Sequence, residues 1–274
     1  MAATVKAIVI SGYGTNCENE VAYACRTAGA QTDIVHISAL LSGRVKLADY
    51  HFLNLAGGFL DGDDLGSAKA GANRLLHAEI KGEKRSLFDD IRAFIAAGKL
   101  VMGVCNGFQL LVKMGLLPAL AGDIRQSCTL TFNDSGRFED RWCRLAVNPA
   151  SPCVYTRGLE QLYLPVRHGE GKFITDSPAT LEQLQLQQLD VLHYADKQGD
   201  ATMTYPDNPN GSIAAIAAVC DASGRIFGLM PHPEAYLHRT HHPRWTREEL
   251  PEEGEGLQLY RNAVHFIQQE FDVV

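Results

Sequence analysis

The segment from Leu100 to Leu111 constrains the fold more than any other part of the chain. It begins with an apolar run typical of a buried strand, breaks at Gly-Val-Cys-Asn-Gly, and continues at once with the spacing of an amphipathic helix. In hydrolases, a strand-to-helix turn of the form Gly-x-nucleophile-x-Gly exposes the reactive side chain in front of a helix N-terminus. Here that position holds Cys105, whose thiolate the helix dipole and the unpaired N–H groups would stabilise.

The alternative interpretation of Cys105 is a buried core cysteine, because free cysteine is among the most buried residue types. The flanking glycines favour the functional interpretation, since they permit a tight turn that a Cβ would obstruct. Cys17 is a weaker candidate nucleophile, because Glu18 and Glu20 oppose a thiolate there. Cys25 recurs at helical spacing with apolar residues and is interpreted as core packing.

The first part of the chain alternates apolar strands with helical connections. Strands are predicted over 5–11, 32–37, 51–55 and 100–104, and helices after Asn16, within 68–80 and over 87–95. Asn16 is expected to cap the first helix. This alternation predicts an α/β fold with a mostly parallel central sheet and helices on both faces. Because site groups collect at the C-terminal ends of such strands, residues 12–16, residues 57–59 and Cys105 should converge.

From Leu117 the pattern changes to alternating apolar and polar residues, which predicts a small antiparallel β section. A charged loop over 236–256 precedes a last helix over 257–271. No repeat or break in composition divides the chain. We therefore expect residues 1–274 to form a single domain with residues 236–256 as an extension.

The bulk composition argues against several classes of protein. With 25 basic and 32 acidic residues the formal net charge is −7, which favours neither nucleic acid nor a membrane surface as a partner. No apolar stretch approaches the ~20 residues of a membrane-spanning helix. Seven irregularly spaced cysteines without a Cys-x-x-Cys pair indicate neither a disulfide framework nor a structural zinc site. The expected location is the cytoplasm.

A cysteine nucleophile needs a base and a group that holds the base in one tautomer. Among ten histidines, His232 stands out because prolines flank it on both sides and favour extended backbone. In an extended segment residues i and i+2 point to the same side, which places Glu234 beside the imidazole. On these residues alone, an exposed turn with a solvated acid stays an open alternative.

The reaction of a thiol with an acyl group also needs donors for the developing oxyanion. The N–H of Asn106, at the predicted helix start, is one candidate donor. The N–H of Gly58, at the end of a neighbouring strand, is the second. The alternative for Gly57-Gly58 is a simple strand-ending turn.

Taken together, these segments resemble the triad-type (class I) glutamine amidotransferases. The resemblance rests on Gly103-Val104-Cys105-Asn106-Gly107-Phe108-Gln109, Gly57-Gly58-Phe59 and Pro231-His232-Pro233-Glu234. It narrows to the glutaminase components of phosphoribosylformylglycinamidine synthase through further motifs in collinear order: 14–18, Gly62-Asp63, 133–138, 168–172 and 208–212. Ala56 and Ala235 depart from that pattern, which usually has proline and arginine there.

The resemblance implies that Cys105 attacks the side-chain amide of glutamine, with His232 as base and Glu234 as the group that orients it. Gly58 and Asn106 correspond to the oxyanion donors. Gln109 corresponds to a contact with the groups on the substrate α-carbon, which the segment His168, Gly169, Glu170 and Gly171 also holds. The thioester is hydrolysed to glutamate, and the ammonia passes to a separate synthetase of purine biosynthesis.

The resemblance also implies which cofactors and partner subunits the reaction needs in addition to this chain. It has no ATP-binding loop of the Gly-x-x-x-x-Gly-Lys-Ser/Thr type, so ATP and Mg²⁺ belong to the synthetase partner and no cofactor or metal is expected here. A small accessory subunit is a further candidate partner. A chain that starts at Met1 favours a stand-alone subunit. His238, His241 and His242 have metal-like spacing but are interpreted as part of a polar loop.

Two other functions compete with a glutaminase. One is a cysteine hydrolase or amidotransferase of the same fold that acts on a different amide, which Gln109 and the 168–171 segment oppose. The other is a non-catalytic module, which would normally lack one of Cys105, His232 and Glu234.

Overall fold

The computed structural model describes residues 4–271 and 273. Its strands are β1 (Lys6–Ser11), β2 (Gln31–His36), β3 (Phe52–Leu55), β4 (Leu100–Val104), β5 (Cys128–Thr131), β6 (Glu139–Val147), β7 (Gln161–His168), β8 (Lys172–Thr175), β9 (Asp190–Ala195), β10 (Ile216–Cys220) and β11 (Ile226–Leu229). Its α-helices are α1 (Glu18–Thr27), α2 (Ile37–Leu41), α3 (Lys69–His77), α4 (Leu87–Ala96), α5 (Asn106–Lys113), α6 (Pro178–Leu186) and α7 (Leu257–Phe271). None of the helices in these residues is both long and apolar enough to cross a membrane.

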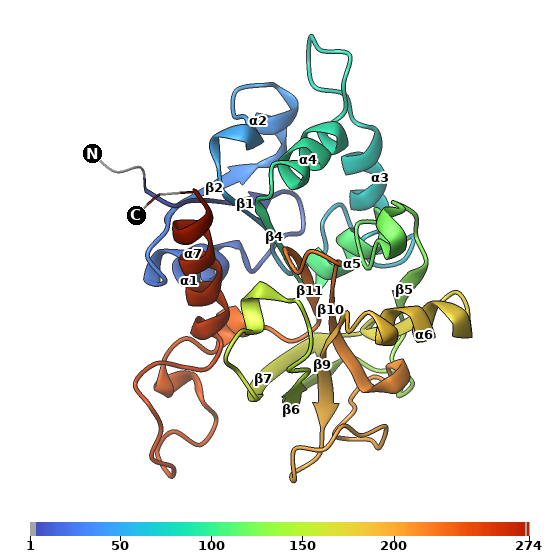
Figure 1. Cartoon of the computed structure of the whole chain (residues 1–274), viewed down its shortest axis with the longest axis vertical. Helices are drawn as coiled ribbons and strands as arrows, with labels where there is room; N and C mark the ends of the chain where they lie inside the picture. Colours follow the sequence, from blue (N-terminus) through green and yellow to red (C-terminus); the bar gives the residue numbers. More distant parts are fainter. Residues whose placement is uncertain (1–3, 272, 274) are drawn as a thin grey trace.

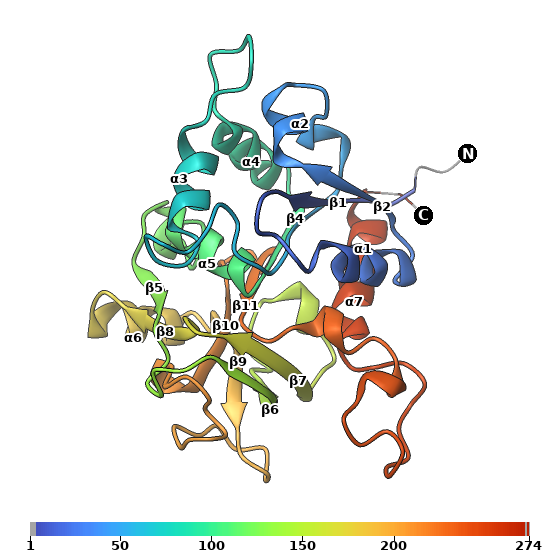
Figure 2. The same cartoon turned by 180° about the vertical axis from the view of Figure 1, so that it is seen from behind.

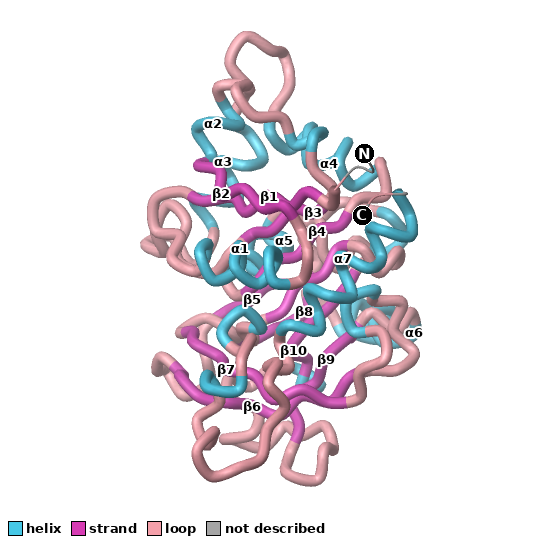
Figure 3. Tube along the Cα trace, turned by 90° about the vertical axis from the view of Figure 1, so that its left-hand side faces the viewer, coloured by secondary structure: helices cyan, strands magenta, loops and turns pink. Residues whose placement is uncertain are grey.

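One long sheet runs through the molecule (Figures 1 and 3). Within the described residues its strand order is β2-β1-β3-β4-β11-β10-β9-β6-β7. Strands β2, β1, β3, β4 and β11 are parallel to their neighbours, whereas the pairs from β11 to β7 are antiparallel. Strands β5 and β8 form a separate antiparallel pair. The predicted α/β class is confirmed, and most of the antiparallel section extends the central sheet.

Helices cover both faces of the parallel half. Helix α5 lies on one face, with α3 packed beside it, and α1 and α7 pack against each other on the opposite face (Figure 2). Successive side chains of a strand point to opposite faces of the sheet, so alternate residues of each strand contact different helices. Gly103 faces α5, whereas Phe52 and Phe227 face the ring of Tyr155, which lies on the side of α7.

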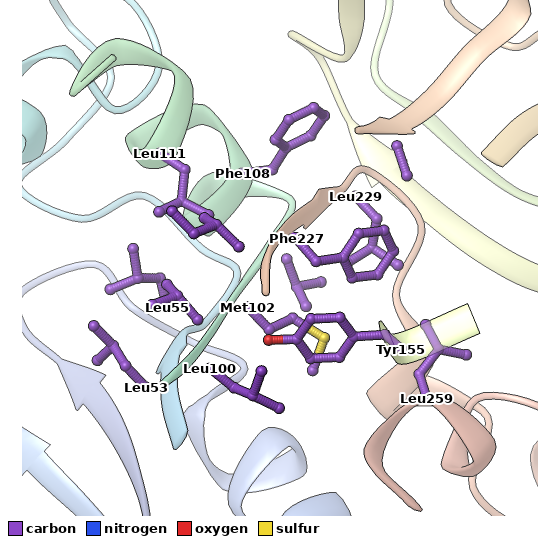
Figure 4. Close-up of a cluster of buried hydrophobic side chains, with 14 of the residues drawn as sticks. Leu53, Leu55, Leu100, Met102, Phe108, Leu111, Tyr155, Phe227, Leu229 and Leu259 are labelled. Atoms are coloured by element: carbon purple, nitrogen blue, oxygen red, sulfur yellow. The ribbon is translucent and has the colours of Figure 1, made fainter. Parts of the chain in front are cut away.

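The hydrophobic core fills the space between these layers (Figure 4). A single cluster of buried apolar side chains runs through the described residues. Tyr155 stacks on Phe227 with ring centroids 5.1 Å apart, and its hydroxyl donates to the carbonyl of Arg225. Burial of each large apolar side chain contributes about 1.5–3 kcal/mol, so this cluster fixes the positions of β3, β4 and β11 relative to one another.

Helix α5 sits unusually close to the sheet because glycines line the contact. A Cβ on Gly103 would lie 2.5 Å from the carbonyl oxygen of Gly107, and one on Gly107 would lie 1.9 Å from that of Leu55. The ring of Phe108 occupies the space over Gly228, where a Cβ would meet it at 2.1 Å. Gly103 and Gly228 are paired neighbours on β4 and β11. The helix that follows Cys105 is therefore seated on a patch of sheet without side chains.

Several local features differ from the sequence prediction, among them helix α2, which was not predicted and begins at Ile37, the last residue of the strand expected over 32–37. The N-cap of α1 is Cys17 rather than Asn16, and its side chain makes no capping bond. Helix α6 was not predicted, because it buries only Thr180 and Leu184 and has little apolar periodicity, although Ser177 caps it and Pro178 follows.

Replacement of Gly107 by alanine tests the close seat of α5. The added Cβ would overlap backbone, which cannot move aside as a side-chain end can, so we expect a loss of about 1–3 kcal/mol in the free energy of unfolding. Urea unfolding measures it. Gly169→Ala is the matched control, since its Cβ would meet only a Phe138 ring carbon at 4.0 Å. Equal stability of the two variants would contradict the packing described.

Candidate active site

Cys105 occupies the turn between β4 and α5, as predicted. Its backbone has φ 52° and ψ −105°, a conformation that L-residues rarely adopt. The strained torsions thus belong to the cysteine itself, whereas Gly103 and Gly107 provide close packing. Strain of this kind costs about 1–3 kcal/mol and persists where the surroundings fix it. Bonds from the Cys105 N–H to the carbonyl of Leu229 (2.8 Å) and from the Gln109 N–H to the carbonyl of Cys105 (3.0 Å) hold the turn.

The strand order brings His232 to Cys105 across more than 100 residues of sequence. Strand β11 lies beside β4, and the chain leaves its end through Met230 and Pro231 to His232. The N–H of His232 donates to the carbonyl of Pro165 on β7 at 2.8 Å. The Arg167 carbonyl, also on β7, lies 3.7 Å from the Cys105 Sγ. The two segments predicted to react are therefore adjacent.

His232 and Glu234 form a buried pair, with Nδ1 and Oε1 2.6 Å apart. Glu234 lies in a 3₁₀ turn, Pro233–Ala235, so the predicted pairing is present although the extended geometry expected for it was wrong. Burial alone would lower the pKa of His232. The Glu234 carboxylate and the Cys105 sulfur outweigh that effect and raise the pKa well above its usual value. His232 can therefore hold a proton beside the Cys105 sulfur.

The Nε2 atom of His232 points toward two thiols. It is buried and lacks a hydrogen-bond partner among the described residues. Cys105 is one neighbour, and Cys17, at the start of α1, is the other. Burial raises the pKa of Cys17, and Glu234 adds to this effect while His232 opposes it. The sequence prediction that Cys17 is the weaker nucleophile agrees with this direction, but the main cause is burial.

These groups open into a cavity of about 500 Å³, a size typical of small-ligand sites. Its lining comes from parts of the chain that lie far apart in the sequence, among them the start of α1, the loop after β3, the Cys105 turn, the end of β7 and the segment after β11. Its lining includes Asn16, Gly58, Phe59, Cys105, Gln109, His168, Gly169, Glu170, His232 and Glu234. The predicted convergence at the C-terminal strand ends is confirmed for residues 16, 58, 59 and 105.

Gly58 lines the cavity, and Asn106 directly follows Cys105 in sequence. Asn106 is the first residue of α5, where N–H groups have no partner within the helix. Gly58 has φ 134°, and a Cβ there would lie 2.5 Å from the carbonyl oxygen of Gly14. The N–H of Phe59 donates to that same carbonyl at 2.8 Å, which fixes the loop. Only glycine fits at position 58.

A chain of hydrogen bonds joins α5 to both walls of the cavity. Asn106 Oδ1 accepts from the N–H of Leu60, and Asn106 Nδ2 donates to Gln109 Oε1 at 3.0 Å. Gln109 Nε2 in turn donates to the carbonyl of Glu170 at 2.7 Å. Both oxygens of the Glu170 carboxylate accept from the N–H of Ser67 at 3.2 Å. Gln109 and Glu170 thus hold the two walls together as well as facing the cavity.

The predicted segment 168–171 divides into two parts. His168, Gly169 and Glu170 line the cavity, whereas Gly171 does not, since it lies behind the imidazole of His168. A Cβ on Gly171 would come within 2.4 Å of that ring. Burial lowers the pKa of His168 to about 3, with a further contribution from His232. His168 is therefore a neutral, structural imidazole.

Two asparagines that carried no predicted role hold this segment. Asn133 Oδ1 lies 3.1 Å from His168 Nδ1 and also accepts from the N–H of Gly171. Asn210 Nδ2 donates to the carbonyl of Gly171 at 2.9 Å and lies 3.4 Å from His168 Nε2. Both residues belong to motifs, 133–138 and 208–212, that were identified only by the family resemblance. Both are buried, which indicates a structural function.

The histidines of the 236–256 extension make different contacts. His242 packs against the rings of Trp142, Tyr163 and Tyr236 at 5.5–5.6 Å, whereas His238 bonds to Glu252. They form no cluster of three metal ligands within the residues described, where the only such group is Cys17, His232 and Glu234.

Comparisons with known proteins agree with this geometry. Residues 4–267 match the family described as the CobB/CobQ-like glutamine amidotransferase domain. The chain is 46% identical over 265 residues to the phosphoribosylformylglycinamidine synthase subunit PurQ of Dehalococcoides mccartyi, covering 97% of this chain and 98% of that protein. It is 42% identical to the PurQ subunit of Methanococcus maripaludis, with 95% and 98% covered. The structure of PurLQS from Thermotoga maritima matches with a TM-score of 0.69 and 27% identity, covering 96% of this chain and 99% of that chain.

The low pKa of His168 predicts a specific pH dependence of stability. An unfolded chain binds a proton at His168 below pH of about 6.5, whereas the folded chain does so only near pH 3, so acid favours unfolding across that range. His168→Asn removes this effect. Between pH 7.5 and pH 5.0, urea unfolding should show that the parent chain loses about 2 kcal/mol more than the variant. If the parent chain and the variant lost the same free energy of unfolding over this pH range, His168 would be protonated in the folded state.

Proposed function

Because the chain belongs to the glutamine amidotransferase family that contains the PurQ subunits of phosphoribosylformylglycinamidine synthase, we propose that it hydrolyses glutamine at Cys105 and delivers the ammonia to a synthetase partner. The observation that carries the proposal is the buried array of Cys105, His232 and Glu234 at the wall of one cavity. In it, a nucleophile, a base and an orienting carboxylate stand in the order that thiol catalysis needs.

The first half of the reaction makes a glutamyl thioester. His232 Nε2 takes the proton of the Cys105 thiol as Sγ attacks the side-chain carbonyl carbon of glutamine. The carbonyl oxygen becomes an oxyanion that the N–H groups of Gly58 and Asn106 stabilise. Loss of one such donor typically costs about 3–4 kcal/mol of transition-state stabilisation. His232 then gives its Nε2 proton to the leaving nitrogen, and the C–N bond breaks to release ammonia.

The second half restores the enzyme. His232 takes a proton from water at Nε2, and the oxygen of that water attacks the thioester carbon. The C–S bond breaks, leaving glutamate and the thiolate of Cys105. Throughout both halves Glu234 accepts the Nδ1–H of His232, which keeps Nε2 directed at the reacting atoms and stabilises the imidazolium.

We propose that the α-amino and α-carboxylate groups of the substrate lie against Gln109 and residues 168–170. The hydrogen bonds of the Gln109 and Glu170 side chains are already used within the protein, so backbone groups of Gly169 and Glu170 are the candidate contacts. This division differs from the sequence expectation for Gly171, which supports His168 from behind. The cavity volume of about 500 Å³ has room for one amino acid.

The partner is a synthetase that uses ATP and Mg²⁺, together with a small accessory subunit. The matching structure from Thermotoga maritima is named PurLQS, and this chain corresponds to one component of it. Three exposed phenylalanines at the mouth of the cavity, Phe59, Phe132 and Phe138, give the partner an apolar surface to cover. All seven cysteines are unpaired, which supports a reducing, cytoplasmic setting.

Replacement of Cys105 by alanine tests the proposed chemistry. With the synthetase partner present, we expect glutamate release to fall at least ~10³-fold, because burial raises the pKa of Cys17, the other thiol in the cavity, and makes it the weaker nucleophile. A glutamine-like diazo-ketone should add mass to Cys105 of the parent chain, as peptide mass spectrometry can show. Cys25→Ala is the matched control, since Cys25 is a buried residue of α1 that does not line the cavity.

Two outcomes would contradict the proposal. One is a Cys105→Ala chain that still releases glutamate at the parent rate. The other is a substrate screen in which the parent chain hydrolyses other amides as readily as glutamine, which would favour a different cysteine hydrolase of this fold.

A further inference from the structure

The side chain of Asn106 has no function in the proposed reaction, which uses only the backbone N–H of this residue. It is 1% exposed and lies in the first turn of α5, directly after Cys105. We propose that its carboxamide is a positioning group, which fixes the two oxyanion donors, Gly58 and Asn106, relative to each other and connects them to the part of the cavity that holds the α-carbon groups of glutamine. The proposal rests on the proposed function and adds a residue that sets the geometry of the same site.

The sheet alone does not fix the two donors relative to each other. The parallel pairing of β3 with β4 ends at Leu55 and Gly103. Gly58 and Asn106 each lie three residues beyond that last pair, one in a loop and the other at the start of a helix. Because the hydrogen bonds between the strands stop before the donors, a further contact has to set the separation of the two segments.

Asn106 supplies that contact through its side-chain oxygen. Its Oδ1 accepts a hydrogen bond from the buried N–H of Leu60 at 3.1 Å. On its other side the same loop is held away from α5, since the N–H of Phe59 donates to the carbonyl of Gly14 at 2.8 Å. Within the residues that the structure describes, no other hydrogen bond joins residues 56–60 to α5. The position of the Gly58 loop against the helix therefore depends on this one side chain.

The carboxamide of Asn106 has only one orientation that satisfies its neighbours. Its Nδ2 donates to Gln109 Oε1 at 3.0 Å, and Gln109 Nε2 donates to the carbonyl of Glu170 at 2.7 Å. One end of this chain is the N–H of Leu60, which can only donate, and the other end is a carbonyl, which can only accept. Turning either amide over would place two donors or two acceptors face to face. The chain therefore has a single polarity from one end to the other.

The chain relates the two ends of a bound glutamine to each other. Asn106 and Gln109 are three residues apart on a helix, which places their side chains on the same face. Both are buried, and hydrogen bonds in such a low-dielectric setting are stronger than in water. The far end of the chain is the backbone of Glu170, where the α-carbon groups of the substrate are proposed to bind. Substrate held there therefore has its side-chain amide at a fixed place relative to the oxyanion donors.

Asn106→Leu tests the positioning function, because it removes both side-chain bonds at similar size and leaves the backbone N–H in place. With the synthetase partner present, we expect kcat for glutamate release to fall about 10- to 100-fold, below the ~10²–10³-fold that loss of a donor itself costs. KM should change less than ~3-fold, since a misplaced donor acts on the transition state and not on the bound substrate. Asn106→Ala lacks the same bonds and should show the same fall.

Gln109→Met tests the connection, since it keeps the Leu60 bond and removes the bonds of Gln109. At saturating glutamine, the double variant with Asn106→Leu should have the same kcat as Asn106→Leu alone, because the two residues act through one chain. Independent effects would multiply, and that result would overturn the connection. Lys113→Met is the matched control on the same helix and should keep the parent kcat, since Lys113 does not line the cavity.

A measurement that needs no activity tests the bond itself. In the full-length chain without its partner, hydrogen exchange of the Leu60 N–H should be at least ~10-fold faster in Asn106→Leu than in the parent chain. Exchange at Leu60 should be unchanged in Lys113→Met. Urea unfolding of each variant shows that the chain is fully folded under the conditions in which the rates are compared.

The outcomes are distinct. A parent chain that releases no glutamate with its partner present would overturn the proposed function and the positioning function together. Glutamate release by the parent chain with an unchanged kcat in Asn106→Leu would overturn the positioning function alone, as would unchanged exchange of the Leu60 N–H in that variant. A raised KM with the parent kcat would show that the Asn106 side chain binds substrate directly, which also contradicts the positioning function.

Discussion

The close contact between α5 and the sheet is the constraint on which the rest of the site depends. Gly103 and Gly107 let helix and strand approach until a Cβ on either would overlap backbone. With so short a distance between the end of β4 and the start of α5, the one residue that joins them must turn sharply. That residue is Cys105, and its positive φ follows from the packing around it. The close packing of α5 on the sheet therefore forces the sharp turn at Cys105.

The order of the strands then places the other parts of the site next to Cys105. Because β11 lies next to β4, the chain that leaves β11 must pass the thiol, and it carries His232. Because β3 lies on the other side of β4, the Gly57-Gly58 turn borders the same space. A buried carboxylate and imidazole are costly to desolvate, so their pairing contributes less to stability than to function. The pair keeps a proton available where water is largely excluded.

The sequence predicted those parts of the site that depend on local patterns. An apolar run followed by Gly-x-Cys-x-Gly was enough to place Cys105 and the start of α5, and the His232–Glu234 pair followed from two-residue spacing. The contact between Cys17 and His232 depends on strand order and on the bonds to Gly57, which no local pattern records. For the same reason, the functions of Asn133, Asn210 and Gly171 as supports of His168 were visible only in three dimensions.

The central claim is that the Cys105 turn binds a glutamine side chain with its carbonyl oxygen between two backbone donors. A crystal structure of the Cys105→Ala chain with its synthetase partner and glutamine tests this most directly. The account predicts the side-chain amide oxygen at ~3 Å from the N–H groups of both Gly58 and Asn106, with the α-carbon groups toward residues 169 and 170. Glutamine bound in the reverse direction, with its α-carboxylate at Asn106, would contradict it.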